Sequence, residues 1–381
     1  MKLETISYQE QNNTEVLWSI SGATFSDINL IVGKNSSGKS RLVAIINSLS
    51  RILLGKHFPI ETCQFSVTLR DAESFHAYEI EFADGGVKRE RLTIDGVPRL
   101  IREEGIAGSI WYEKEQKNIE FSSPSNSVAA ASRRDEVQHS FLSTLASWAN
   151  SVAFYAFGTP FGREHFVGMS DFASLLRNPK LAANDDPNNL VGTYLAAFLR
   201  FGERLDAAII RDMAQLGYKL TDVGSGDMKE LIPGFPSSLA CMYVVEADVG
   251  IRVPQIHISQ GMFRALALVI HLNINTLSEN KKTIIVDDIG EGLDFSRAMG
   301  IINLLMEKTH EDGNQLLMTS NDRFIMNEIP LKYWSLLKRD GRRVSVYNEH
   351  NAKKSFDQFK YIGLNNFDFF ASDFIDGEAS R

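Results

Sequence analysis

The residues best suited to chemistry in this chain form one short run, Gly33-Lys34-Asn35-Ser36-Ser37-Gly38-Lys39-Ser40. Small residues let successive backbone N–H groups turn towards one anion, and the start of a helix adds its positive dipole end. The ammonium of Lys39 then reaches the β- and γ-phosphates of a nucleotide, and the Ser40 hydroxyl binds Mg²⁺. A plain turn between a strand and a helix would not require a lysine after the last glycine. We therefore predict that this loop binds nucleotide phosphates.

The segments on both sides of the loop have the patterns that such a loop requires. Residues 28–32 are a mostly apolar run, which predicts a buried strand. Leu42, Ile45, Ile46, Leu49, Ile52 and Leu53 recur at helical spacing after the loop. Two short strands are expected before it, at residues 3–8 and 15–20. Tyr8 or Trp18 in these strands could stack on adenine, although an aromatic here is more often part of the core.

A second group of candidate residues lies far along the chain. Asp287 and Asp288 close the apolar run 283–286. In a nucleotide-binding α/β sheet such a strand lies beside the phosphate-loop strand, so that the first carboxylate holds the Mg²⁺ hydration shell and the second polarises the attacking water. Three neighbouring motifs favour this reading over simple strand termination: Ser259-Gln260-Gly261 before a helix, Glu291-Gly292-Leu293-Asp294, and the strand 315–320 followed by Asn321.

These motifs, in this order, resemble those of the ABC-type ATPase superfamily, in particular its soluble RecF/SMC-like and OLD-like branch. The resemblance covers residues 1–60 and 240–340. It implies that Ser259-Gln260-Gly261 is the signature motif, which meets the γ-phosphate of the ATP bound to a second subunit. It also implies that Asp287 is the Mg²⁺-associated aspartate and that the loop ending at Asp294 crosses the dimer interface.

Two positions depart from the family pattern. Asp288 stands where the family has a catalytic glutamate, and Asn321 stands where it has a histidine that senses the γ-phosphate. An aspartate is one methylene shorter, and an asparagine carries no proton or charge at pH 7. The expected catalytic residues are therefore Lys39, Asp288 and Asn321, in an ATPase that hydrolyses slowly. Gln138 is a candidate for the family's Mg²⁺-sensing glutamine, although a solvated helix start is the more common role for such a residue.

The resemblance implies a homodimer with two ATP molecules held between its subunits. The leading hypothesis is a regulatory ATPase whose dimer controls a separate effector, such as a nuclease or toxin, in bacterial anti-phage defence. One rival is a DNA-repair ATPase that binds nucleic acid at DNA ends. Another is a scaffold that binds ATP with negligible hydrolysis. The sequence names neither the effector nor the trigger.

The expected fold is α/β, an ABC-type P-loop ATPase head with a mixed central sheet, an antiparallel β subdomain and a helical insertion. We expect four segments: an N-terminal ATPase lobe that includes the β subdomain (1–158), a mostly helical insertion (159–238), a C-terminal ATPase lobe (239–350) and an aromatic-rich tail (351–381). A helix is predicted at about 135–150, with Val137, Phe141, Leu145 and Trp148 on one stripe. The tail aromatics predict a helix packed on the core, with a docking element as the alternative.

Composition adds limits on the class of protein. The chain has 381 residues, 44% of them hydrophobic, which suits a globular protein with a sizeable core. No apolar run approaches the ~20 residues of a membrane span, and the first residues lack a secretory signal, so a cytoplasmic protein is expected. A net charge of −8 argues against a broadly basic surface for nucleic acid but not against a local basic groove. Cys63 and Cys241 are expected to be buried thiols.

Overall fold

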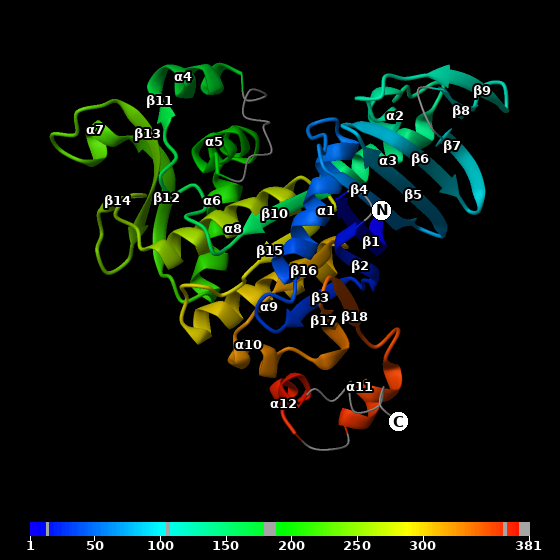
Figure 1. The fold of residues 1–381 in the computed structure, drawn as a ribbon. Helices are drawn as coiled ribbons and strands as arrows, with labels where there is room; N and C mark the ends of the chain where they lie inside the picture. The colour runs from blue at the N-terminus through cyan, green and yellow to red at the C-terminus, as the bar shows by residue number, and fades with distance from the viewer. Residues whose placement is uncertain (13–14, 104–106, 179–187, 361–363, 373–381) are drawn as a thin grey trace. The chain divides into compact units, whose positions relative to one another are not determined.

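The computed structural model describes residues 1–12, 15–103, 107–178, 188–360 and 364–372. By internal contacts the chain groups into two units, which are described separately here (Figure 1). The first unit contains residues 1–153, 282–285 and 315–381, and the second contains residues 154–281 and 286–314. The four-segment organisation expected from the sequence stays a prediction.

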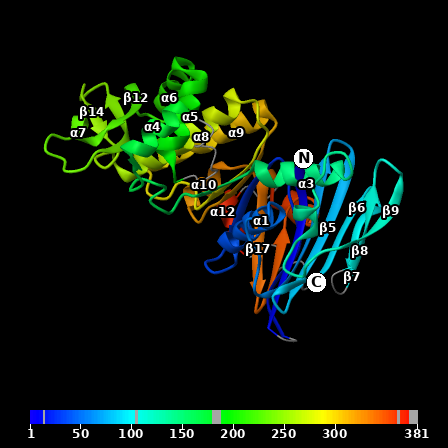
Figure 2. The ribbon, with the colours of Figure 1, turned by 90° about the horizontal axis from the view of Figure 1, so that it is seen from above.

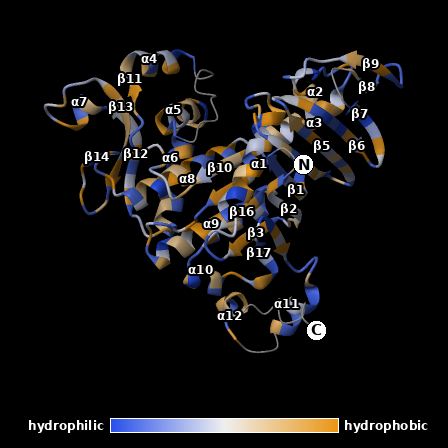
Figure 3. Cartoon of the chain, viewed as in Figure 1, coloured by the Kyte–Doolittle hydropathy of each residue, from blue (hydrophilic) through white to orange (hydrophobic). Residues whose placement is uncertain are grey.

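The phosphate loop of the first unit follows a strand that is buried along its whole length. Strand β3 (Ile28–Gly33) lies between β16 (Gln315–Thr319) and β17 (Trp334–Asp340) and runs parallel to both. Strands β3 and β16 are coloured mostly as hydrophobic in Figure 3, as expected for parallel strands that are covered on both faces. Helix α1 (Lys39–Leu53) follows the loop and buries Leu42, Ile46 and Leu49, so the predicted strand–loop–helix unit is confirmed.

The described strands continue from this parallel centre into an antiparallel sheet. The order is β10-β15-β16-β3-β17-β18-β2-β1-β4-β5-β6-β7-β8-β9, and the later strands stand one after another in Figure 2. Alternate residues of β5 are buried, including Tyr78, Ile80 and Phe82. This one-sided burial confirms the antiparallel β subdomain that the sequence predicted. The bounds not yet given are β1 (Lys2–Asn12), β2 (Glu15–Thr24), β4 (Thr62–Asp71), β5 (Ser74–Ala83), β6 (Gly86–Ile94), β7 (Val97–Glu103), β8 (Ala107–Tyr112), β9 (Lys117–Ser122), β10 (Val152–Ala156), β15 (Thr283–Asp287) and β18 (Arg343–Tyr347).

The helix predicted at about 135–150 begins later than the sequence suggested. After the short α2 (Ala129–Ser132), helix α3 runs over Ser140–Ser151 and buries Phe141, Leu145 and Trp148. Val137 lies outside α3 and is 70% exposed, so its assignment to the buried stripe was wrong. The reason is local, because the Asp135 carboxylate accepts hydrogen bonds from the N–H groups of Val137 and Gln138 and holds a turn there.

The second unit combines helices with a small antiparallel sheet. Helix α5 (Leu190–Phe201) ends and α6 (Glu203–Gln215) begins at Gly202, whose φ is 59°. In the small sheet β13 (Leu239–Glu246) lies between β11 (Val167–Gly168) and β12 (Leu220–Asp227), and β14 (Arg252–Pro254) also pairs with it. Strand β12 was not anticipated, because its Gly, Ser and Asp residues disfavour a strand. The helices not yet named are α4 (Met169–Arg177), α7 (Met228–Leu231), α8 (Gln260–Leu277) and α9 (Phe295–Asp312).

The described part of the C-terminal tail packs into the first unit. It follows α10 (Arg323–Glu328) and forms α11 (Lys353–Lys360) and α12 (Asn366–Ala371). Phe356, Phe359 and Phe369 are at most 2% exposed, and the ring of Phe369 lies 4.7 Å from that of Phe356 and 4.9 Å from that of Phe359. Core packing is therefore confirmed for these three rings, while the predictions for Tyr361 and Phe374 fall outside the described residues.

The two cysteines are buried and free, as predicted. Burial raises the pKa of the Cys63 thiol to about 12 and that of the Cys241 thiol to about 11, so both stay protonated at neutral pH. Within the described ranges, every helix is too short or too polar to cross a membrane.

Candidate nucleotide-binding site

The phosphate loop is shaped by two residues with positive φ. Ser36 has φ 64° and Gly38 has φ 104°, which turns the backbone between β3 and α1. A side chain could not be added at Gly38, because its Cβ would lie 2.9 Å from the indole ring of Trp18. A Cβ at Gly33 would lie 2.9 Å from the carbonyl oxygen of Leu337. Close approach therefore requires glycine at both positions, and the positive φ of Gly38 adds backbone freedom as a second reason there.

The side chain of Lys39 folds back over this loop. Its ammonium donates hydrogen bonds to the carbonyl oxygens of Gly33, 2.9 Å away, and Lys34, 3.4 Å away. The side chain is buried, and the adjacent Ser40 is exposed. The lysine charge is therefore held at the centre of the loop, where a β- or γ-phosphate would meet it.

The loop has the unsatisfied donors that an anion would complete. Helix α1 begins at Gly38 without a side-chain cap and without an acidic residue in its first turn. The buried hydroxyl of Ser37 has no hydrogen-bond partner among the described residues. An uncapped helix start, an orphaned hydroxyl and a lysine fit a bound phosphate chain, and the Ser40 hydroxyl fits its Mg²⁺.

Asn321 lies at the same sheet edge as the loop. Strands β16 and β3 are parallel, with Thr319 opposite Ile31, so both end at one edge. Asn321 follows β16 and is exposed, while Ser320 donates its backbone N–H to the carbonyl of Ile31, 3.4 Å away. The structure therefore brings this predicted residue to the edge where the loop begins.

Gln138 lies elsewhere in the first unit, in the turn that precedes α3. It is exposed, its backbone N–H donates to Asp135, and its carbonyl accepts from the N–H of Glu113, 3.1 Å away. Its assignment to the metal stays a prediction. The described residues contain no group of three His, Cys, Asp or Glu side chains able to hold a metal by themselves.

In the second unit, the predicted signature motif opens α8. Ser259 is the N-cap residue, and its hydroxyl accepts a hydrogen bond from the N–H of Met262, 3.3 Å away. Both Ser259 and Gln260 are exposed. A Cβ at Gly261 would lie 2.8 Å from the carbonyl oxygen of Gly292, so this position requires glycine. The structure thus brings the predicted signature motif against the predicted dimer-interface loop.

Arg264 is a residue that the sequence analysis did not single out. It is 4% exposed, and its guanidinium donates to the carbonyl oxygens of Thr159 (2.8 Å), Glu291 (2.8 Å) and Gly158 (3.1 Å). Burial lowers the pKa of this arginine, although it stays charged. Arg264 therefore fixes the first turn of α8 to two separate loops. The sequence signal that could have identified Arg264 is its position three residues after Gly261, which places both residues on the same face of α8.

The paired aspartates also belong to the second unit's loops. The carbonyl of Asp287 accepts a hydrogen bond from the N–H of Phe157, 2.9 Å away. Asp288 has φ 55°, a conformation that aspartate tolerates better than most residues. A Cβ at Gly158 would lie 3.9 Å from the Cβ of Asp288 and 2.9 Å from a carboxylate oxygen of Glu291. The carboxylate of Glu291, which was not predicted to act, therefore lies beside Gly158 together with the Cβ of Asp288.

Asp294 caps α9. Its carboxylate accepts from the backbone N–H of Arg297, 3.0 Å away, and pairs with the guanidinium of the same residue at 2.7 Å. The backbone hydrogen bond is the largest cause that lowers the pKa of Asp294. The Arg297 guanidinium also lies 4.5 Å from the ring centroid of Tyr218. The residue predicted to lie at the interface is therefore held rigidly in its loop.

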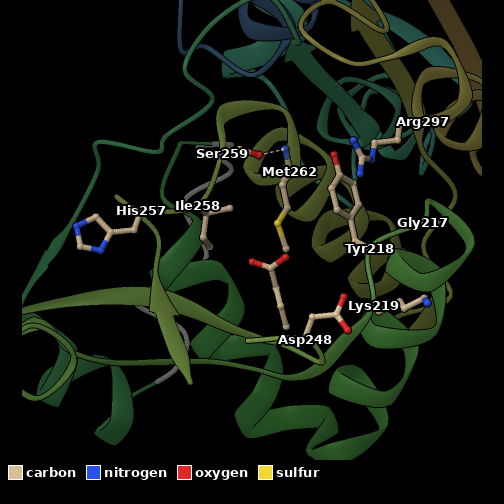
Figure 4. A pocket seen from close by; sticks show the side chains of 10 residues that line it. Gly217, Tyr218, Lys219, Asp248, His257, Ile258, Ser259, Met262 and Arg297 are labelled. Carbon is tan, nitrogen blue, oxygen red and sulfur yellow. Dashed lines mark hydrogen bonds between the residues drawn. The ribbon is translucent and has the colours of Figure 1, made fainter. Parts of the chain in front are cut away.

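A polar pocket adjoins the signature motif. It has a volume of about 490 Å³, and its lining includes Tyr218, Lys219, Glu246, His257, Ser259 and Arg297. Figure 4 shows Ser259 at its rim, with the hydrogen bond to Met262 drawn as a dashed line. Charges of both signs surround this hollow, so it is not a simple anion site.

Comparisons with known proteins agree with this geometry. A family model described as "AAA domain, putative AbiEii toxin, Type IV TA system" matches residues 28–327. No curated protein matches the sequence. Among solved structures, an SMC head crystallised with the C-winged helix domain of ScpA is similar, with a TM-score of 0.52 and 13% identity over 91% of this chain and 98% of that one. At this identity the likeness concerns the fold, and it confirms the expected α/β ATPase head.

Proposed function

Since this chain belongs to the AAA domain family described as a putative AbiEii toxin of a type IV toxin–antitoxin system, and has the fold of an SMC-like ATPase head, we propose that it binds ATP and hydrolyses it slowly to control a separate effector. The observation that carries the proposal is the loop at residues 33–40. There a buried lysine side chain (Lys39), the orphaned Ser37 hydroxyl and the uncapped start of α1 occur within one run of eight residues.

Each site residue has a defined task in this proposal. The loop amides and Lys39 bind the β- and γ-phosphates, and Ser40 and Asp287 hold the metal, with Gln138 as a further candidate. Bound Mg²⁺ supplies charge neutralisation on the phosphates. Asp288 orients and deprotonates the attacking water. Asn321 donates a hydrogen bond to the γ-phosphate.

Slow turnover follows from two of these residues. Asp288 is short, and its φ of 55° commits the backbone to a conformation in which a longer side chain would be strained. Asn321 donates a hydrogen bond without a positive charge, so it stabilises developing phosphate charge less than a protonated histidine would. A slow ATPase suits a timer or switch whose bound state must persist.

We further propose that two copies pair with ATP between them. The support is in the second unit, where Ser259 and Gln260 are exposed at a helix start and Gly261 touches the loop that leads to Asp294. A helix start of this kind attracts a phosphate from another molecule. Because the ligand then contacts both copies only in the paired state, ATP would favour the dimer.

The effector belongs to the same proposal. The family description names a toxin–antitoxin system, and the similar SMC head was crystallised with a protein partner. Both support a cytoplasmic regulator that acts on another protein, such as a nuclease or toxin, in anti-phage defence. The rival proposal from the SMC-like fold is a DNA-end-binding ATPase. DNA binding with a steep salt dependence would favour that rival, since each phosphate contact releases counterions.

The decisive experiment measures ATP turnover and assembly on the same sample. We expect slow hydrolysis and a dimer in analytical ultracentrifugation that appears with Mg²⁺-ATP and disappears without it. Turnover of tens per second would contradict the switch. A molecule that binds no ATP would contradict the whole proposal.

A further inference from the structure

The guanidinium of Arg41, two residues after Lys39, lies over the ring of Trp18. Its guanidinium carbon is 4.5 Å from the Trp18 ring centroid. Trp18 is 2% exposed, and its ring is the one that a Cβ at Gly38 would touch at 2.9 Å. The indole therefore forms a buried wall against the loop, and the guanidinium covers it.

A carboxylate fixes this guanidinium in place. Arg41 forms an ion pair with Glu10 of β1, and the Arg41 side chain keeps 42% of its surface exposed. One face of the planar group is occupied by the indole, so the exposed surface includes its outer face and edge. Since Glu10 balances the charge, Arg41 is better suited to offer a flat surface than to neutralise a phosphate.

The position of Arg41 in the chain favours contact with a nucleotide base. It is the third residue of α1, directly after Lys39 and Ser40. When Lys39 and Ser40 bind the β- and γ-phosphates and the metal, the ribose and the base of the nucleotide must lie outside the loop, against its side. Trp18 and Arg41 form part of the surface on that side of the loop. Guanidinium planes are established stacking partners for bases.

We infer that the outer face of Arg41, supported by Trp18 and held by Glu10, is the surface on which the base of the nucleotide stacks. This inference rests on the proposed function and adds the recognition of the base to it. The burial of Trp18 agrees with the sequence analysis, in which a core position was the more common role for this aromatic. That ring is too deeply buried to meet adenine itself, and Arg41 presents a stacking surface in its place. The interaction depends on the planar shape of the guanidinium, so lysine would not replace it.

The test compares ATP with inorganic tripolyphosphate, which has the phosphates without the base. Affinities for both, with Mg²⁺, are measured by isothermal titration calorimetry for the wild type, Arg41→Ala and Arg41→Lys. We expect the ratio of ATP affinity to tripolyphosphate affinity to fall about tenfold in both variants, because one stacking contact is lost. Arg41→Lys keeps the positive charge, so its tripolyphosphate affinity should stay close to that of the wild type.

A matched control is available in the same unit. Arg99 of β7 stacks on Trp111 with the same geometry, 4.6 Å from the guanidinium carbon to the ring centroid, but at the other end of the strand order. Arg99→Ala should leave the ratio unchanged. An unchanged ratio in both Arg41 variants would overturn the inference, and so would equal losses for ATP and tripolyphosphate, which would make Arg41 a phosphate ligand. A wild type that binds neither ligand would instead contradict the proposed function itself.

Discussion

The hydroxyl of Ser259 accepts a hydrogen bond from the backbone N–H of Met262, 3.3 Å away, and thereby caps α8. The same oxygen is the atom proposed to meet the γ-phosphate bound to a second copy. A helix cap and a phosphate contact make different demands on this residue. The cap requires only an acceptor, whereas the phosphate contact requires the absence of negative charge.

Substitution of Ser259 by aspartate should separate these two roles. Aspartate caps a helix as well as serine does, so Ser259→Asp should keep the free energy of unfolding within ~0.5 kcal/mol of the wild type. Its carboxylate repels a phosphate, so the ATP-dependent dimer should be lost in ultracentrifugation. Ser259→Ala is the companion variant, which should lose ~1 kcal/mol of stability with the cap. A dimer that persists with ATP in Ser259→Asp would refute the proposed contact.

Removal of the loop lysine should abolish nucleotide binding. Lys39 supplies the one ammonium that folds over the loop in the described structure, so Lys39→Ala should weaken ATP binding at least ~100-fold, since a buried charged contact is lost. Calorimetry with Mg²⁺-ATP measures this directly. Arg51→Ala, in the last turn of the same helix, is the control and should bind ATP like the wild type. Equal effects of the two substitutions would show that the loop is not the site.

Substitution of Asp288 by asparagine should stop hydrolysis without preventing binding. Asparagine tolerates positive φ as aspartate does, so the backbone at φ 55° should be kept. Loss of the carboxylate should lower kcat about 100-fold, within the usual range for a general base. The control is Asp84→Asn, an exposed turn position with φ 53°, which should leave kcat unchanged. Unchanged hydrolysis in Asp288→Asn would direct attention to Glu291.

The stability of the first unit should fall in mild acid because of His76. This side chain is 5% exposed, its Nδ1 has no partner among the described residues, and burial lowers its pKa. The unfolded chain, with an ordinary histidine pKa of about 6.5, therefore binds the proton more tightly than the folded chain. Stability from this group is complete above pH ~6.5 and is lost as the pH falls through the folded pKa.

Urea denaturation at pH 7.5 and at successively lower pH measures this effect. His76→Gln should flatten the dependence, because glutamine does not titrate. His57→Gln, at an exposed position, serves as the control and should preserve the slope. If the stability of His76→Gln depended on pH as steeply as that of the wild type, the pH dependence would come from other titratable groups.

The packed tail gives a prediction about stability. Phe369 is fully buried against Phe356 and Phe359. Phe369→Ala should therefore lower the free energy of unfolding by ~3–5 kcal/mol, because it leaves a cavity. Phe370 is only partly buried, so Phe370→Ala should lower the free energy of unfolding by a smaller amount. Denaturant midpoints provide the measurement. If Phe369→Ala kept its stability but lost assembly, the tail would be a docking element instead.

Local sequence signals located the phosphate loop and the strand before it, whereas β1 and β2 extend beyond the strands expected at residues 3–8 and 15–20. The strand that ends at Asp287 was expected beside the phosphate-loop strand, and this was wrong, because β16 lies between β15 and β3. A buried apolar strand, small residues and a lysine at a helix start are contiguous in the chain, so their structure depends on neighbours that are adjacent in sequence. The same holds for Ser259 as the start of α8. Where the prediction erred, as at Val137, a short side-chain hydrogen bond from Asp135 competed with helix formation.

The sequence by itself determined a strand–loop–helix unit around residues 33–40, a serine at the start of α8 and two carboxylates at the end of a buried strand, because each of these is encoded within about ten consecutive residues. Only the tertiary structure decided which distant residues meet. It placed the Arg41 guanidinium on Trp18, pressed Gly261 against Gly292 and directed Arg264 to the carbonyls of two loops. The reason is that the close packing of the folded chain fixes contacts between residues far apart in sequence, and local patterns do not specify those contacts.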